Sequence, residues 1–320
     1  MFRKVLSTSL TLVVAVSLLL GAAPTTGPHP DEVMVRYPAG TTKLLVADLA
    51  RLTNDPALAE AVMAPLAAAR HPLNGVRQVV EGTLGLPTAL VSFVAHGTGP
   101  GISGLSLIQG PPSQALFGPL FGLQFAVGAP RSPFTNSDLT TSNGRPLMRT
   151  GGNSGPVQIQ WGYAVDGNAL LVGTETSFGP PPNVARLEAT MAAATARANG
   201  VGPSFDELLL ALNARGCDLA FVRATNPAQD RPAAPGEQAA SASITLTDGG
   251  ASVFFDVRFA TAAQAAAALA ALNSGASPYL AQDLYQGELV HARVQGNELK
   301  FTVNTDLTGL VGLLLVLMPN

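Results

Sequence analysis

The same hairpin turn occurs twice in this chain of 320 residues. The six residues from Val165 to Leu170 recur in pattern from Val294 to Leu299, with glycine and asparagine at the centre of both copies. A Gly-Asn pair between segments of alternating apolar residues is typical of a two-residue β-hairpin connection. The repeat therefore predicts antiparallel strand pairs in both halves of the chain, and it predicts architecture rather than chemistry.

Two consecutive units follow from this repeat. Residues 28–200 and residues 201–320 each indicate a strand, a hairpin, a helix, a second hairpin and a second helix. We expect an α+β fold made of two tandem repeated units of antiparallel sheet with helices packed on one face. The first unit differs from the second by a long irregular insertion near 126–156.

Local signals place several elements within the units. Val253 to Phe259 alternate apolar and polar residues, which predicts a strand with one buried face. Thr261 and Gln264 form a capping-box pattern, and Asp55 followed by Pro56 predicts the start of another helix, bent or shortened near Pro65. The segment 226–240, rich in Pro, Ala and Gln, is expected to be an exposed linker.

The amino terminus predicts export. Arg3 and Lys4 precede an apolar run from Val5 to Ala23, which is the layout of a secretory signal peptide, assigned to residues 1–27. The expected location is periplasmic or extracellular. An uncleaved membrane anchor is the minority alternative, since the run reaches only the lower end of the roughly 17–25 apolar residues that span a bilayer.

Composition excludes several partners. Charged residues make up 12% of the chain and the net charge is -3, so no basic surface is expected to attract nucleic acid. Cys217 is the only cysteine, so an internal disulfide is impossible. The four histidines, at positions 29, 71, 96 and 291, lack the spacings that place two imidazoles on one face. We expect no metal and no cofactor.

Two stretches imitate catalytic motifs. Gly99 to Gly104 matches G-x-G-x-x-G, but a strand rather than a helix follows, so no helix N-terminus would meet a pyrophosphate. The loop around Ser154, with His71, His96 and Asp138 before it, follows the order of chymotrypsin-like proteases, although that pattern has a further glycine after the serine. A serine hydrolase is a distant alternative, and we assign no catalytic residue.

The start of the predicted mature chain carries a resemblance. Tyr37 to Leu49 reads as proline, small residues, an apolar strand and then Asp-Leu before a helix. This opening, with the leader and the repeated hairpin and helix units, resembles uncharacterised secreted envelope proteins of Gram-negative bacteria. The resemblance implies an envelope location and supplies no catalytic residues.

Two regions are candidates for function. Aromatic residues and the insertion after them could form a ligand or partner surface. The candidate binding residues are Phe117, Phe121, Phe125, Phe134 and Trp161. The segment from Leu307 to Met318 is apolar on all sides, which predicts a core helix between the units, or alternatively a helix that docks on another subunit or on a membrane surface.

The sequence thus predicts an exported, non-enzymatic binding or structural module of the bacterial cell envelope. Its partner would be an envelope protein that the sequence does not identify. The alternative is a carrier of an apolar small molecule, because the low charge and two facing sheet layers could leave a partly open apolar core.

Overall fold

A computed structural model describes most of the chain after the predicted leader. The described residues are 36–38, 40–69, 71–78, 81, 91, 93–109, 138–142, 145–154, 156–166, 169–196, 217–224, 234–277, 279 and 287–317. The predicted signal peptide, residues 1–27, lies outside them. None of the helices within these ranges has the length and apolar character required to cross a bilayer.

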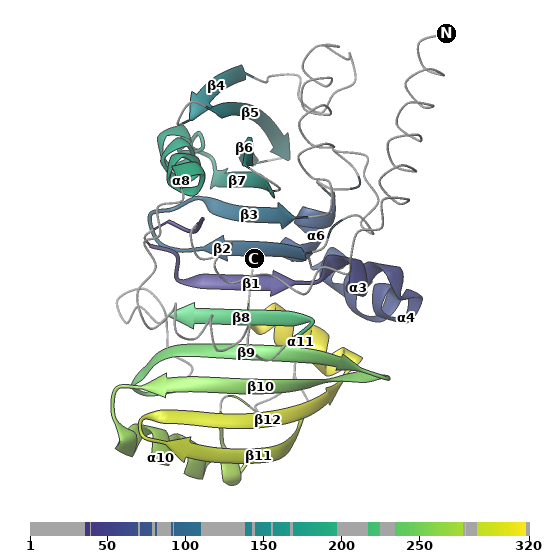
Figure 1. The fold of residues 1–320 in the computed structure, drawn as a ribbon, viewed down its shortest axis with the longest axis vertical. Coiled ribbons are helices and arrows are strands. Elements are labelled where there is room, and N and C mark those ends of the chain that lie inside the picture. The colour runs from purple at the N-terminus through teal and green to yellow at the C-terminus, as the bar shows by residue number, and fades with distance from the viewer. Residues whose placement is uncertain are drawn as a thin grey trace.

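Within the described residues, twelve strands form a single sheet in which every pairing is antiparallel (Figure 1). Their order across the sheet is β11-β12-β10-β9-β8-β1-β2-β3-β7-β6-β5-β4. The strands are β1 (Lys43–Ala47), β2 (Phe93–Thr98), β3 (Gly104–Gln109), β4 (Asp138–Ser142), β5 (Arg145–Ser154), β6 (Val157–Asp166), β7 (Ala169–Phe178), β8 (Leu219–Ala224), β9 (Glu237–Thr247), β10 (Gly250–Phe259), β11 (Gly287–Gln295) and β12 (Glu298–Asp306). The helices are α3 (Leu49–Asn54), α4 (Pro56–Leu58), the π-helical turn η1 (Ala59–Met63), α5 (Ala64–Ala68), α6 (Pro72–Gln78), α8 (Val184–Ala196), α10 (Ala262–Asn273) and α11 (Leu307–Leu317).

The two predicted units meet inside this sheet. β1 of the first half pairs with β8 of the second, from Lys43 opposite Arg223 to Ala47 opposite Leu219. The α+β class is therefore confirmed. The pairing of β1 with β8 joins the strands of the two predicted units into one continuous sheet. Both hairpins of the repeated turn are present, as β6–β7 and β11–β12.

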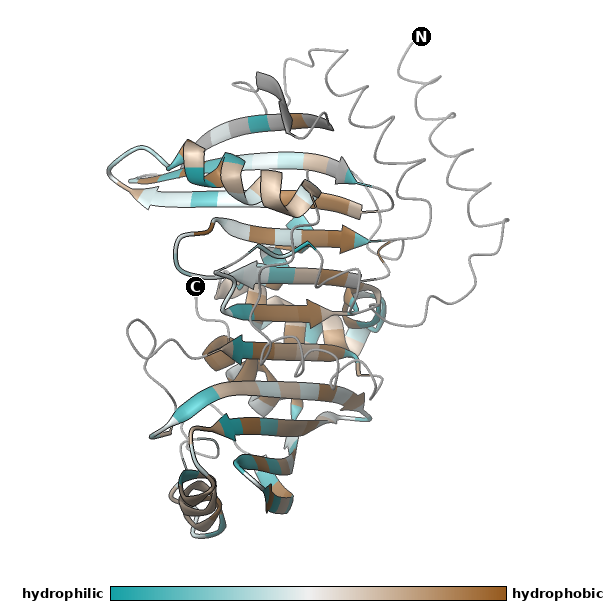
Figure 2. Cartoon of the chain, turned by 60° about the vertical axis from the view of Figure 1, so that its left-hand side comes forward, coloured by the Kyte–Doolittle hydropathy of each residue, from teal (hydrophilic) through white to brown (hydrophobic). Residues whose placement is uncertain are grey.

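The central strands are buried on both faces. Leu45 and Ala47 of β1 belong to one core cluster, whereas Leu44 and Val46 belong to a second cluster on the opposite face. A strand covered on both sides needs a continuous apolar run rather than alternation, and β1 has one. Figure 2 shows hydrophobic residues concentrated in these middle strands.

Helices cover both faces, which corrects the prediction of helices on one face. The helix-rich face, which carries Leu45 and Ala47, is covered by α3 to α6, α10 and α11. Helix α8 lies on the opposite face, where its buried Leu187 and Met191 pack with Leu44 and Val46 in the second cluster. The sequence pattern marks an apolar stripe on a helix, but it does not say which face of a sheet the stripe meets.

Two paired glycines allow α8 to pack closely against the sheet. Gly162 of β6 lies opposite Gly173 of β7. A Cβ added to Gly173 would lie 2.6 Å from Leu187 Cδ1 and 2.8 Å from Met191 Sδ. Because neither glycine has a side chain, the helix approaches the two strands closely at this point.

The predicted alternation in β10 is confirmed. Val253 to Phe259 place their apolar side chains in the core of the helix-rich face, where Phe255 stacks on Phe301 of β12 with ring centroids 4.7 Å apart. On the opposite face Asp256 forms an ion pair with Lys300, and Arg258 pairs with Glu298 at 2.8 Å. These cross-strand pairs between β10 and β12 match apolar with apolar side chains on one face and opposite charges on the other.

Two predicted irregular stretches are partly strand. The insertion near 126–156 contains β4 and β5, which form a hairpin at one margin of the sheet. The predicted linker 226–240 overlaps the start of β9, and Ala239 and Ala240 are buried there. Small side chains are typical of a linker, and they also suit a strand packed between two neighbours.

Helix starts follow the predicted caps. The Asp55 side chain accepts hydrogen bonds from the backbone N–H groups of Ala57 and Leu58, with Pro56 in the first turn. The predicted bend near Pro65 is present as the π-helical turn η1, after which α5 begins. Proline has no N–H to donate, so a widened turn before it accommodates the missing hydrogen bond.

The apolar C-terminal helix α11 lies between the two halves, as predicted for a core helix. It contacts β10 and β12 of the second half and η1 and α5 of the first. Its Leu310 and Leu314 are fully buried. The capping box that starts α10 is also present, with Thr261 and Gln264 hydrogen-bonded to each other's backbone N–H groups.

Candidate functional site

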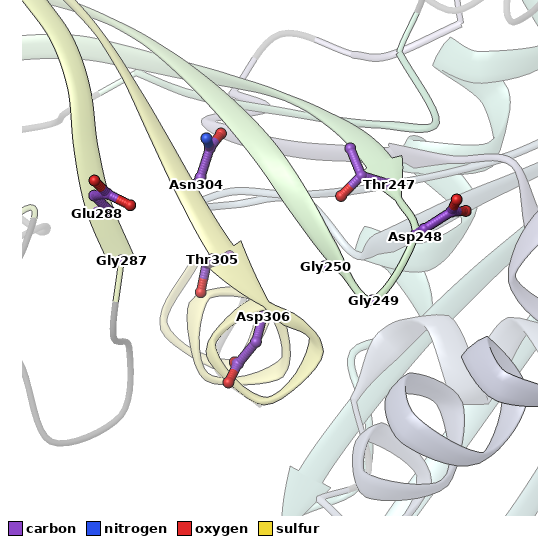
Figure 3. Close-up of a pocket in the computed structure, with 9 residues that line it drawn as sticks. All are labelled: Thr247, Asp248, Gly249, Gly250, Gly287, Glu288, Asn304, Thr305 and Asp306. Carbon is purple, nitrogen blue, oxygen red and sulfur yellow. The ribbon is translucent and has the colours of Figure 1, made fainter.

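An open hollow of about 620 Å³ lies at one margin of the second half. It is formed by the β9–β10 turn, the start of β11 and the end of β12, as Figure 3 shows. Its lining residues are Thr247, Asp248, Gly249, Gly250, Gly287, Glu288, Asn304, Thr305 and Asp306.

Glycine at the β9–β10 turn shapes the hollow. Gly249 has φ +84°, a conformation that residues with a side chain rarely adopt. A Cβ on Gly250 would lie 2.3 Å from the backbone oxygen of Thr305. Since that oxygen belongs to a paired strand, the turn sits close to β12 only because position 250 has no side chain.

The hollow is acidic. Asp248, Glu288 and Asp306 are exposed, and the lining includes no basic side chain. One carboxylate has a structural task as well, since Asp306 Oδ1 accepts a hydrogen bond of 2.7 Å from the backbone N–H of Gly309 in the first turn of α11. Three carboxylates around one opening favour a cationic group there.

The neighbouring edge of β11 is the second element of the site. Within the described residues no strand pairs with its outer side, because β11 stands last in the sheet order. The register with β12 shifts between Leu289 and His291, so Val290 forms a bulge and is 57% exposed. From His291 to Gln295 the strand is regular, and the side chain of Arg293 is exposed.

Geometry of the β11–β12 hairpin indicates which amides face outward. With a two-residue turn, Gln295 and Glu298 form the first hydrogen-bonded pair, and hydrogen-bonded and non-hydrogen-bonded pairs then alternate. The backbone groups of Ala292 and Val294 consequently point away from β12. An extended segment could pair with these groups.

The predicted aromatic surface is only partly observed. Phe117, Phe121, Phe125 and Phe134 lie outside the described residues. Trp161 lies in β6, opposite Thr174 of β7, and is partly buried against the core of the helix-rich face. The structure therefore gives Trp161 a packing role.

The residues of the serine-hydrolase pattern are not brought together. Ser154 ends β5 opposite Val157, and four strand spacings separate β5 from β2, which carries His96. Neighbouring strands lie about 4.8 Å apart, so β5 and β2 are about 19 Å apart measured across the sheet. Asp138 is one strand further out, in β4.

His96 has a different serine as its partner. Its Nδ1 lies 2.8 Å from Oγ of Ser106, the residue directly opposite on β3. Burial lowers the pKa of His96 to about 4, and the charge of His71 acts in the same direction. A neutral imidazole beside a hydroxyl on adjacent strands is an ordinary cross-strand pair.

Buried ion pairs that the sequence did not predict hold other parts of the fold. The Glu237 carboxylate receives hydrogen bonds from Arg223, from the Tyr279 hydroxyl at 2.7 Å and from the backbone N–H of Ala234 at 3.3 Å. Burial is the main cause that raises the pKa of Tyr279, and the charge of Glu237 raises it further. Because these donors hold the carboxylate in place inside the fold, the cluster is a structural one.

A second buried carboxylate fastens α8. Glu175 of β7 receives two hydrogen bonds of 2.6 Å from Arg186, and the hydroxyl of Ser103 donates to it at 2.5 Å.

Among the described residues, no group of three or more His, Cys, Asp or Glu side chains is arranged to hold a metal ion.

Comparisons with known proteins find structural likeness alone. No family model matches the chain, and no curated protein matches it. Solved crystal forms of TP0453 align along nearly the whole chain. Form I is 10% identical over 91% of this chain and 98% of that one, with a TM-score of 0.49. Form IV is 11% identical over 92% and 99%, with a TM-score of 0.47, and form III is 11% identical over 87% and 95%, with a TM-score of 0.46. A likeness of this size has no bearing on what the chain binds.

Proposed function

We propose that this protein is an exported, non-enzymatic binding module of the bacterial cell envelope, and that it binds an extended segment of a partner protein along β11. The supporting observation is that an open strand edge from His291 to Gln295 adjoins an acidic hollow at the start of the same strand. Main-chain hydrogen bonds along the edge would supply affinity, and a basic side chain in the hollow would supply orientation.

The bulge at Val290 limits this edge to a short partner. A bulge and nearby charges are features that keep long strands from pairing edge to edge. Glu288 and Arg293 are exposed on either side of the bulge. The regular stretch that remains is five residues long, which suits a peptide segment better than the full strand of a second copy.

The polar lining supports a protein partner over an apolar small molecule. All nine residues around the hollow are glycine, threonine, asparagine or acidic. Native mass spectrometry of the protein taken from its own envelope separates the two possibilities, because a carrier would retain a mass of a few hundred daltons.

A matched pair of peptides tests the proposal. Fluorescent hexapeptides of alternating valine and threonine, one with a terminal lysine and one with a terminal glutamate, would be titrated while anisotropy is followed. We expect the lysine peptide to bind more tightly, and we expect the Asp248→Asn/Glu288→Gln variant to lose that preference.

The backbone contribution has its own variant. Ala292→Pro removes an outward N–H that the ladder with β12 does not use, so binding should weaken while the fold persists. Thr302→Val, on the polar face of the covered strand β12, serves as the control. Absence of binding to the wild type, or equal binding of both peptides, would refute the proposal.

The two halves are further proposed to be duplicated units. Counted outward from the centre, the first half reads β1, β2, β3, β7, β6 and the second reads β8, β9, β10, β12, β11. The repeated Gly-Asn turn then joins equivalent strands in the two halves. On this proposal the hairpin β4–β5 is an addition to the first unit, outside the five shared positions.

A further inference from the structure

His71 lies in the region where α5 and α6 of the first half approach the C-terminal helix α11, which is called the joint below. It lies between α5 and α6, and its side chain is fully buried. Its backbone N–H donates to the Leu66 carbonyl at 2.8 Å, which fixes the turn between the two helices. The backbone of Leu314 in α11 lies close to the ring and favours its protonated form, whereas burial favours the neutral form more strongly and lowers the pKa of His71. Three helices therefore converge on one imidazole.

The ring acts as a cap in its neutral form. His71 Nδ1 accepts a hydrogen bond of 3.3 Å from the backbone N–H of Leu73, in the first turn of α6. The other ring nitrogen, Nε2, is buried and has no hydrogen-bond partner among the described residues. Protonation would turn the accepting nitrogen into a donor that faces another donor, so the cap would be lost.

The surrounding elements offer no carboxylate to compensate a charge on the ring. Helices α5 and α11 contain no titratable side chain. Helix α6 contributes Arg77, which is paired with Glu81 at 2.9 Å, and η1 contributes Glu60, which is exposed. Strand β2 contributes His96, on which a charge at His71 acts unfavourably. Among these elements, every titratable neighbour of His71 is thus paired, exposed or another imidazole.

We propose that the docking of α11 against α5 and η1 is acid-sensitive, and that His71 is the residue that takes up the proton. Acidification removes the cap of α6 and places a positive charge in the joint, which favours separation of the three helices. Because α11 is apolar on nearly all sides, its release exposes Leu310 and Leu314, which are buried at neutral pH. The inference is independent of which partner binds at β11.

The size of the effect follows from the shift at His71. Burial lowers its pKa from 6.5 to about 4, while the Leu314 backbone acts in the opposite direction. If opening restores the ordinary pKa, the opening equilibrium at pH 5 is about 30-fold more favourable than at neutral pH.

Hydrogen exchange measured by mass spectrometry on the full protein tests this. After correction for the intrinsic pH dependence of exchange, peptides covering α11 should lose protection by about 30-fold between pH 7.5 and pH 5. Peptides covering the β9–β10 hairpin should keep theirs. In His71→Gln, whose amide oxygen can still accept from Leu73, the loss should disappear.

The control is His291→Gln, since His291 is exposed on β11 and should leave the acid response unchanged. Three results would overturn the proposal: unchanged protection of α11 in the wild type, equal loss in α11 and the β9–β10 hairpin, or the same loss in His71→Gln. If His71→Gln does not fold, the comparison of α11 with the hairpin in the wild type decides alone.

Discussion

Gly97 in β2 lies against the ring of Tyr37, and this contact leaves no room for a side chain. An added Cβ would lie 2.4 Å from Tyr37 Cε1 and 2.6 Å from Cδ1, and 3.3 Å from Cγ2 of Thr41. Carbon atoms in contact are normally about 3.5–4.0 Å apart, so the overlap exceeds 1 Å. Tyr37 is fully buried and its hydroxyl donates to the Leu105 carbonyl, so a shift of the ring would disturb its buried contacts and this hydrogen bond.

We therefore expect Gly97→Ala to lower the free energy of unfolding by about 2–3 kcal/mol, the upper part of the range for an overpacked core. Urea unfolding followed by circular dichroism measures it. Gly75→Ala is the matched control, because Gly75 is exposed within α6 and an added Cβ meets no atom within 4 Å. There, alanine should stabilise the protein by up to about 1 kcal/mol.

A double-mutant cycle separates the clash from any effect on strand propensity. In a Tyr37→Leu background the ring is gone, so Gly97→Ala should cost at least about 1 kcal/mol less than in the wild type. A neutral or stabilising Gly97→Ala, or a cost that is unchanged by Tyr37→Leu, would refute the reasoning.

Three further predictions concern stability. Burial lowers the pKa of His71 from 6.5 to about 4, so the folded state binds fewer protons than the unfolded state between these values. Its contribution is complete above about pH 6.5 and is lost as the pH falls toward 4, and the wild type should lose up to about 3 kcal/mol more than His71→Gln in urea titrations across this window. Arg223→Met removes an ion pair from the buried carboxylate of Glu237 and should cost about 3–5 kcal/mol, seen as a lower urea midpoint; an unchanged midpoint would contradict this. Thr261→Ala breaks the capping box with Gln264 and should cost about 1 kcal/mol, whereas Thr261→Ser should recover most of it.

The candidate site was accessible from the sequence only in part. The Asp-Gly-Gly triplet that begins at Asp248 is typical of a hairpin turn, and the repeated turn around Gly296 predicts a strand on either side of it. Nothing in the sequence placed Asp248, Glu288 and Asp306 around one opening, because that depends on β12 lying between β10 and β11. For His71 the sequence offers only incomplete metal-ligand and catalytic patterns, and the hydrogen bond that its Nδ1 accepts from the Leu73 N–H is seen only in the structure.

The sequence by itself determined the features of this protein that depend on short-range interactions. The Gly-Asn turns, the alternation in β10, the caps at Asp55 and Thr261 and the burial of α11 each depend on residues within a few positions of one another, where backbone geometry and hydrophobic pattern act directly. The tertiary structure decided which strands meet and which face each helix covers. Backbone hydrogen bonds can form between any two strands with free edges, so they do not by themselves select a partner. The pairing of β1 with β8 and the position of α8 depend on how the apolar side chains of the whole chain are buried together.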